Sequence, residues 1–344
     1  MSRPRGLPGK LWRHARLQAD ATLAGRQARL TLDRAVSKRH RVLVGPWLAE
    51  VGFELLYWIP FLHGLRTGAG VALPPMVVVS RGGTASWYGD ACDTYVELHE
   101  LFEPDDLIAR QEARVRSHGG RKHTALDALD REAIQRAVDH LGGEKLEVLD
   151  PSLMFRRFRP VWMGRRPVRV VVDEARPRMI VPPDDRPPSL PERYIAVKVY
   201  TSETTPPEAQ RRLAEIIGML ARDVAVVALT TGERYDDHLD TPLAGVPGVH
   251  LLPAVPAARN LAVQTAVIAG AEAFVATYGG PSYLGPLLGV PTIALYSRPQ
   301  FAGVHLDVLR AWLSQLPSSG FSLMDLRHAD HVLGGASRLD LRLL

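Results

Sequence analysis

The stretch that most constrains the fold is residues 266–297, which read AVIAGAEAFVATYGGPSYLGPLLGVPTIALYS. It contains the end of an apolar helix (266–270), a short apolar strand (273–277), a glycine turn with a small helix, and a second apolar strand (292–296). Short apolar strands separated by helices are typical of a parallel sheet covered on both faces. Ligands of such sheets bind at the carboxyl ends of the strands, so the glycine turn is a candidate site.

The turn consists of Gly279 and Gly280, followed by Pro281. Two glycines permit a tight turn and a close approach of a ligand to the backbone. Proline suits the first turn of a helix, and the N–H groups of residues 282–284 would then face a phosphate. A tight turn before a core helix, with no ligand, is the alternative that glycines alone leave open. The predicted phosphate contacts are Thr277, Tyr278, Gly279, Gly280, Ser282 and Tyr283.

The same rhythm of strands and helices runs through the rest of the chain. We expect strands at 41–45, 76–80 and 168–172, a helix over 51–65, and mostly helix over 94–150. Residues 181–191, VPPDDRPPSLP, hold five prolines and predict a semi-rigid linker between two domains. The expected units are a basic helical arm (1–40), an α/β domain (41–185), a second α/β domain (186–316) and a tail (317–344), for which crossing back to the first domain is one alternative.

Three stretches resemble bacterial glycosyltransferases of the GT-B fold, in particular heptosyltransferase-like and fucosyltransferase-like enzymes. They are residues 274–297, residues 45–60 (GPWLAEVGFELLYWIP) and residues 196–206 (AVKVYTSETTP), and the resemblance covers most of 41–316. It implies two Rossmann-like domains that face a central cleft. It also implies metal-independent transfer of a sugar from a nucleotide-diphosphate donor to a hydroxyl of a glycan, a lipid-linked sugar or a small molecule, with no further cofactor.

Two carboxylates and one lysine are the candidates for the chemistry. Glu50 and Glu54 fall in the loop and first helical turn after the first strand, where a carboxylate can act as a general base or simply complement the helix dipole. Lys198, with Thr201 and Ser202 close behind it, would reach the diphosphate, or would lie on a strand with its charged end in solvent. The chain has no Asp-x-Asp, and His118 and His123 lack metal spacing, so no metal site is expected.

The basic charge is concentrated at the N-terminus. Residues 1–41 hold eleven Lys or Arg against two Asp, a net +9, and since the whole chain carries +5 the remainder carries −4. Leucines at 11, 17, 23 and 30 and Val36 give a thin apolar stripe, which predicts a solvated helix dispensable for folding. The alternative is a peripheral anchor on anionic lipid. A nucleic-acid partner is not expected, because aromatic residues are not interleaved with the basic ones.

Length and composition are those of a two-domain globular protein: 344 residues, 46% hydrophobic and 23% charged. The single cysteine, Cys92, excludes an internal disulfide, and we expect a cytoplasmic enzyme with peripheral membrane contact as an option. A protein of the same shape that only binds a sugar or nucleotide, or an epimerase, is the alternative function. The epimerase needs acids and histidines around the sugar, and no histidine lies between Arg41 and His63.

Overall fold

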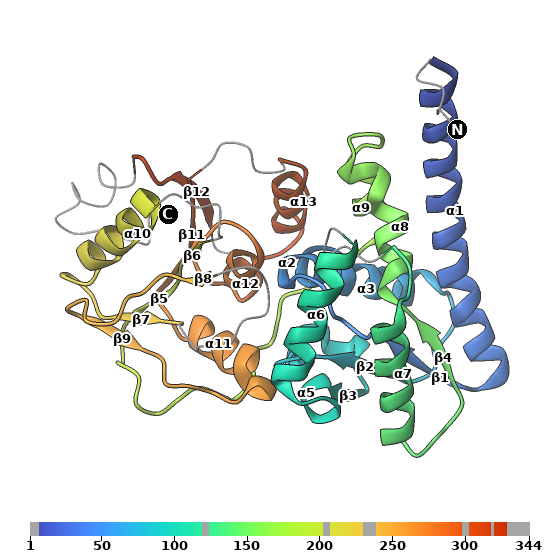
Figure 1. Ribbon diagram of the computed structural model, residues 1–344, viewed down its shortest axis with the longest axis horizontal. Coiled ribbons are helices and arrows are strands. Elements are labelled where there is room, and N and C mark those ends of the chain that lie inside the picture. The colour runs from blue at the N-terminus through green and yellow to red at the C-terminus, as the bar shows by residue number, and fades with distance from the viewer. Residues whose placement is uncertain are drawn as a thin grey trace.

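The computed structural model describes residues 7–118, 124–201, 207–229, 239–297, 303–317 and 320–328. Its framework is two separate parallel β-sheets, each covered by helices (Figure 1). The first sheet has the order β3-β2-β1-β4, and all of its strand pairs are parallel. Its strands are β1 (Arg41–Val44), β2 (Met76–Ser80), β3 (Thr94–Glu97) and β4 (Leu146–Leu149).

The second sheet has six parallel strands in the order β12-β11-β10-β5-β7-β9. The apolar strand of the glycine-turn stretch, β10, lies inside this sheet, with Phe274 opposite Thr292 on one side and Ala196 on the other. The strands are β5 (Ile195–Lys198), β7 (Val226–Ala228), β9 (Val249–Leu251), β10 (Ala273–Thr277), β11 (Thr292–Tyr296) and β12 (Phe321–Asp325), and a short antiparallel pair is formed by β6 (Tyr200–Thr201) and β8 (Leu239–Asp240).

Residues 51–68 form one continuous helical segment, α2 (Val51–Phe53), a π-helical stretch (Glu54–Trp58) and α3 (Ile59–Gly68). The other helices of the first half are α1 (Leu7–Lys38), α4 (Ala85–Tyr88), α5 (Leu98–Leu101), α6 (Pro104–His118), α7 (Ala128–His140), α8 (Pro151–Trp162) and α9 (Arg169–Glu174). Those of the second half are α10 (Pro207–Leu220), α11 (Asn260–Ala269), α12 (Leu284–Leu287) and α13 (Gly303–Leu313), and short 3-10 turns occupy Gly89–Ala91, Ala257–Arg259 and Gly280–Tyr283. No helix in the described part of the chain combines the length and hydropathy needed to cross a bilayer.

The α/β class and the two parallel sheets confirm the sequence prediction, but several elements differ. The strand predicted at 168–172 is wrong: α9 occupies that stretch, and of its side chains only that of Val171 is buried, whereas an apolar strand inside a sheet would bury most of them. The region 94–150 is not purely helical, because it contributes β3 and β4. The sequence after Gly320 gave no signal, yet β12 forms an edge of the second sheet there.

The expectation that the N-terminal helix is solvated is wrong along one of its faces. Helix α1 packs along α8 through a face of alanines, Ala21, Ala24, Ala28 and Ala35, all fully buried. The stripe expected from leucine spacing faces outward instead, since Leu23 and Leu30 are exposed. Small side chains let two helices approach closely, so this helix packs through its alanines and not through its exposed leucines.

The two halves are held together by specific contacts as well as by a shared apolar core. The indole of Trp87 donates to Thr265 Oγ1 at 2.9 Å, and the indole of Trp312 in α13 donates to the carbonyl of Leu56 at 3.0 Å. Helix α13 therefore belongs to the second half by sequence and packs on the first (Figure 1).

Candidate functional site

The carboxyl ends of the two sheets meet where α2 begins. A Cβ added to Gly52 would lie 2.9 Å from Gly280 Cα, and one added to Gly280 would lie 3.2 Å from Gly52 N. Only two glycines allow the backbones to pass this closely. The structure thereby brings together two of the loops singled out from the sequence, the one that carries Glu50 and the one that carries Gly279 and Gly280.

The glycine turn is tied by its own hydrogen bonds. Ser282 Oγ donates to the Gly279 carbonyl at 2.7 Å and accepts from Gly279 N at 3.2 Å, while Ser282 N donates to the same carbonyl at 2.9 Å. Leu284 N donates to Pro281. The expectation that the N–H groups of Ser282 and Leu284 are open toward a phosphate is therefore wrong, because both are used inside the turn.

The remaining residues of the turn divide into buried and accessible ones. Thr277 Oγ1 is bonded to the backbone N and O of Tyr200, each at 3.0 Å, and thus fixes the end of β10 to the neighbouring segment. Tyr283 is buried, lies edge-on to Tyr278 at 5.9 Å between ring centroids, and burial holds its pKa well above the usual value. Tyr278, Gly279 and Gly280 are half-buried, so these are the parts of the turn that a ligand can touch.

Glu54 lies behind this surface, with no exposed area. Its Oε1 accepts from Ser80 Oγ at 2.7 Å and from the Tyr88 hydroxyl at 2.6 Å, while its Oε2 has no hydrogen-bond partner in the described part of the chain. Burial raises the pKa of this carboxyl from 4.5 to about 7, against the opposing attraction of Arg81. Glu54 is thus an internal group, and in this structure it does not face the junction.

Arg81 connects Glu54 to the loop that carries Glu50. Its guanidinium is buried and donates to the carbonyls of Trp47 at 3.1 Å and Ala49 at 2.7 Å. Glu50 follows directly, half-buried and in extended backbone conformation just before α2, two residues before Gly52. Of the two predicted carboxylates, Glu50 is therefore the one placed at the junction of the two halves.

Lys198 is engaged in an internal ion pair. Its Nζ lies 2.8 Å from Asp240 Oδ1 and donates to the Leu229 carbonyl at 2.8 Å. Thr201 follows in β6, whose backbone pairs with β8, and Ser202 lies outside the described residues. The lysine predicted to meet a diphosphate is thus already neutralised by a carboxylate of its own half.

A second glycine turn, Gly82-Gly83, follows β2, and two aromatic residues, Trp87 and Tyr88, come shortly after it. The carboxylate of Glu97 fills this turn and accepts from Gly82 N at 3.0 Å and from Gly83 N at 2.8 Å. Both aromatic residues are buried. The first half therefore supplies its own anion at this turn. Residue type and spacing did not single out Glu97 or Arg81, because their partners are distant in sequence.

His305 reaches the junction from α13. Its Nδ1 lies 2.6 Å from the Tyr57 hydroxyl, and its ring packs edge-on to Phe53 at 5.1 Å between centroids. His305 thus belongs to the second half by sequence and contacts side chains of the first. Among the described residues, no group of three or more His, Cys, Asp or Glu side chains gathers as a metal site would require.

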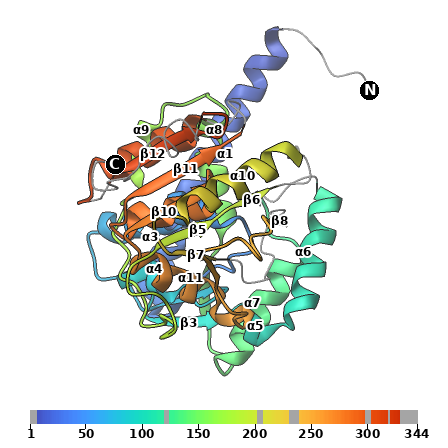
Figure 2. The same ribbon diagram turned by 90° about the vertical axis from the view of Figure 1, so that its left-hand side faces the viewer.

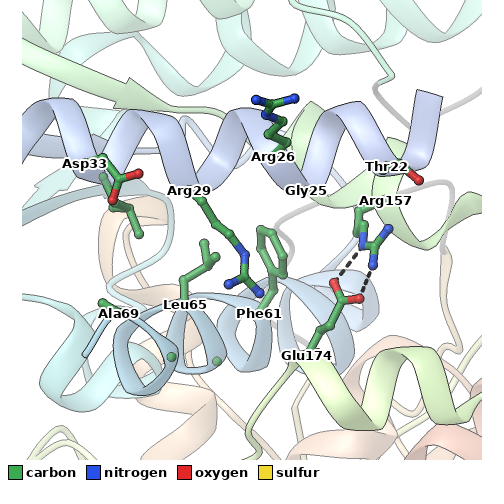
Figure 3. Close-up of a pocket in the computed structure, with 13 residues that line it drawn as sticks. Thr22, Gly25, Arg26, Arg29, Asp33, Phe61, Leu65, Ala69, Arg157 and Glu174 are labelled. Atoms are coloured by element: carbon green, nitrogen blue, oxygen red, sulfur yellow. Dashed lines mark hydrogen bonds and ion pairs between the residues drawn. The ribbon is translucent and has the colours of Figure 1, made fainter. Parts of the chain in front are cut away.

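A cavity of about 430 Å³ lies elsewhere, between α1 and α3 (Figure 3). Arg29 reaches from α1 toward α3 beside Phe61, and Arg157 at the far end is ion-paired with Glu174. None of the residues that line this cavity belongs to the Glu50 loop or to the Gly279-Gly280 turn, so the cavity is separate from the junction of the halves.

No protein-family model matches the chain, and no curated protein matches its sequence. Solved structures do resemble it over most of its length. They include the glycosyl transferase family 9 protein of Veillonella parvula (14% identity, 87% of this chain and 89% of that one, TM-score 0.42) and the E. coli heptosyltransferase WaaC solved with ADP (14%, 86% and 98%, TM-score 0.37). The UDP-GlcNAc 2-epimerase of Methanocaldococcus jannaschii is another (11%, 87% and 93%, TM-score 0.32). Glycosyltransferases, heptosyltransferases among them, are thus among the structures that this chain resembles, as its sequence predicted.

Proposed function

We propose that this chain is a glycosyltransferase that moves a sugar from a nucleoside-diphosphate donor to a hydroxyl acceptor without a metal ion. The observation that carries the proposal is the contact of Gly52 with Gly280. It places a half-buried carboxylate, Glu50, beside a glycine turn, at the carboxyl ends of two parallel sheets. That edge is where ligands of such sheets bind.

The donor is expected against the accessible part of the turn, Tyr278, Gly279 and Gly280. The Gly52–Gly280 contact leaves no room for a phosphate between the two backbones, so the diphosphate would lie beside it. Stabilisation of the charge that grows on the leaving diphosphate would fall to the N–H of Gly280, because the N–H groups of Tyr278 and Gly279 donate to the Leu295 carbonyl and to Ser282 Oγ. The absence of Asp-x-Asp from the sequence supports a diphosphate held by the protein alone.

Glu50 is proposed as the general base. The acceptor hydroxyl would transfer its proton to the Glu50 carboxylate as its oxygen attacks the anomeric carbon. The bond from that carbon to the diphosphate oxygen breaks at the same time, and the nucleoside diphosphate leaves with the electron pair. Arg81 would hold the Glu50 loop through Trp47 and Ala49, and Glu54 would position Arg81 from the interior.

An epimerase is the second candidate. His305 meets Tyr57 and Phe53 at the junction, which supplies a histidine beside the segment from Arg41 to His63, where the sequence has none in between. Incubation with a nucleotide sugar alone, followed by proton NMR, separates the two reactions. Epimerisation without an acceptor would favour this candidate, and turnover only with an acceptor would favour transfer.

The first experiment is a thermal-shift panel of UDP-, GDP-, ADP-, CDP- and dTDP-sugars, since a ligand that binds the native state raises its apparent stability. Two matched variants then locate the site by calorimetry. Gly280→Val places a side chain in the glycine turn and against Gly52. Gly52→Val places one against Gly280 from the first half and leaves the turn's own sequence unchanged. Loss of donor binding in Gly280→Val alone would support the turn as the binding site. Equal loss in both variants would refute it, because the damage would then come from the contact of the halves.

A further inference from the structure

The outer face of α1 carries large apolar side chains that nothing in the described structure covers. Trp12 is 62% exposed, Leu23 55% and Leu30 44%. They are separated by eleven and seven residues, which are close to three and two full turns of an α-helix. The three side chains therefore form one line along the helix, on the side away from the buried alanines.

Arginines accompany this line. The Arg16 guanidinium lies over the Trp12 ring at 5.5 Å from its centroid. Arg26 lies at the rim of the cavity between α1 and α3, and Figure 3 shows its side chain pointing away from α3. Neither Arg16 nor Arg26 has an ion-pair or hydrogen-bond partner among the described residues. In contrast, Lys38 near the end of the helix is paired with Glu147 at 2.8 Å.

The opposite face of α1 packs against the protein, so the face with the exposed tryptophan and leucines is turned outward. The alanine face packs on α8, and the helix runs along the edge of the first half, its N-terminal turns projecting beyond the body in both views (Figures 1 and 2). The alternating tryptophan, leucine and arginine side chains are thus displayed on a rigid support.

We propose that the outer face of α1, defined by Trp12, Arg16, Leu23, Arg26 and Leu30, binds the surface of a bilayer that contains anionic lipids. Tryptophan and leucine enter the boundary between headgroups and acyl chains, and arginines are attracted to the negative surface. This contact is independent of the proposed sugar transfer.

Charge complementarity selects a bilayer over a second copy of the chain. Two copies joined through this face would bring unpaired arginines of one α1 against those of the other, a repulsion that anionic headgroups instead neutralise. Added salt should accordingly weaken the binding, since the attraction is between exposed charges.

The test is co-sedimentation of the full chain with vesicles of phosphatidylcholine and phosphatidylglycerol at 3:1, compared with pure phosphatidylcholine. The triple variant Trp12→Ser, Leu23→Ser, Leu30→Ser should bind at least about tenfold more weakly, because three interfacial side chains are lost. The matched control, Val71→Ser with Val181→Ser, removes exposed apolar side chains away from α1 and should bind as the parent does.

A second pair of measurements keeps the test decisive if the triple variant folds poorly. Arg16→Glu with Arg26→Glu should abolish the preference for anionic vesicles, and brominated lipid should quench the parent's fluorescence but not that of Trp12→Phe. Equal binding of parent and charge-reversed protein would overturn the proposal. A dimer in light scattering that dissociates in the triple variant would also overturn it, because a second copy would then be the occupant.

Discussion

The buried carboxyl of Glu54 should make the stability of this protein depend on pH in a defined window. Its pKa rises from 4.5 to about 7 on folding, because burial disfavours the charged form more than Arg81 favours it. The stabilisation of the folded protein that comes from this raised pKa is fully present below pH 4.5, where the carboxyl is protonated in both the folded and the unfolded chain. It is lost as pH rises to about 7, since the unfolded chain ionises first. A shift of this size corresponds to about 3 kcal/mol.

Glu54→Gln removes this ionisation while keeping an oxygen that can accept from Ser80 and Tyr88. The amide nitrogen would take the place of Oε2, which has no partner, at a cost of about 1–3 kcal/mol that does not depend on pH. We therefore expect the difference in unfolding free energy between parent and variant to change by about 3 kcal/mol between pH 4.5 and 7.5, in favour of the variant at the higher pH.

Urea unfolding at half-unit steps of pH measures this difference. Because other groups titrate in the same range, the comparison with the variant, rather than the parent's own curve, reports on Glu54. Glu103→Gln, at an exposed position, is the matched control and should follow the parent throughout. Parallel curves for parent and Glu54→Gln would refute the reasoning, because Glu54 would then be ionised in the folded protein and balanced by Arg81.

Three further predictions follow from the packing and the site. Once a donor and an acceptor are known, Glu50→Gln should keep donor binding and lower turnover by roughly two to four orders of magnitude, and turnover within a few-fold of the parent would remove Glu50 from the mechanism. Gly64→Ala puts a Cβ 1.9 Å from the Glu174 carbonyl and should cost about 3 kcal/mol or more in urea unfolding, whereas Gly68→Ala in the same helix meets nothing within 4 Å and should be neutral or stabilising by up to about 1 kcal/mol. Deletion of residues 1–38 should lower the melting temperature by roughly 10 °C or more, because it uncovers the helix that packs on it, and an unchanged melting temperature would restore the expectation of a dispensable arm.

The sequence was sufficient to predict those features that depend on local burial. The apolar runs at 273–277 and 292–296, broken by glycine turns, predicted the parallel strands that the second sheet contains. The same logic placed the Glu50 loop and the Gly279-Gly280 turn at strand ends. Since strand ends of two facing sheets converge, their meeting at Gly52 follows from the class of fold.

The identity of each side chain's partner was decided only by the tertiary structure. Lys198 pairs with Asp240, and Glu97 fills the Gly82-Gly83 turn, through contacts between residues 14 or more positions apart. A pattern of residue types shows that a charge needs a partner, but not which one it finds.

Which face of a helix is buried could likewise not be predicted from the sequence. Leucine spacing over residues 11–36 showed only a thin apolar stripe and predicted a solvated helix. The structure instead packs the alanine face on α8, because small side chains let the two helices approach closely. In the helical segment after β1, both Glu50 and Glu54 were candidates for the site. Packing against Ser80 and Tyr88 turns Glu54 inward and leaves Glu50 at the junction, a choice made by neighbours that only the folded chain brings together.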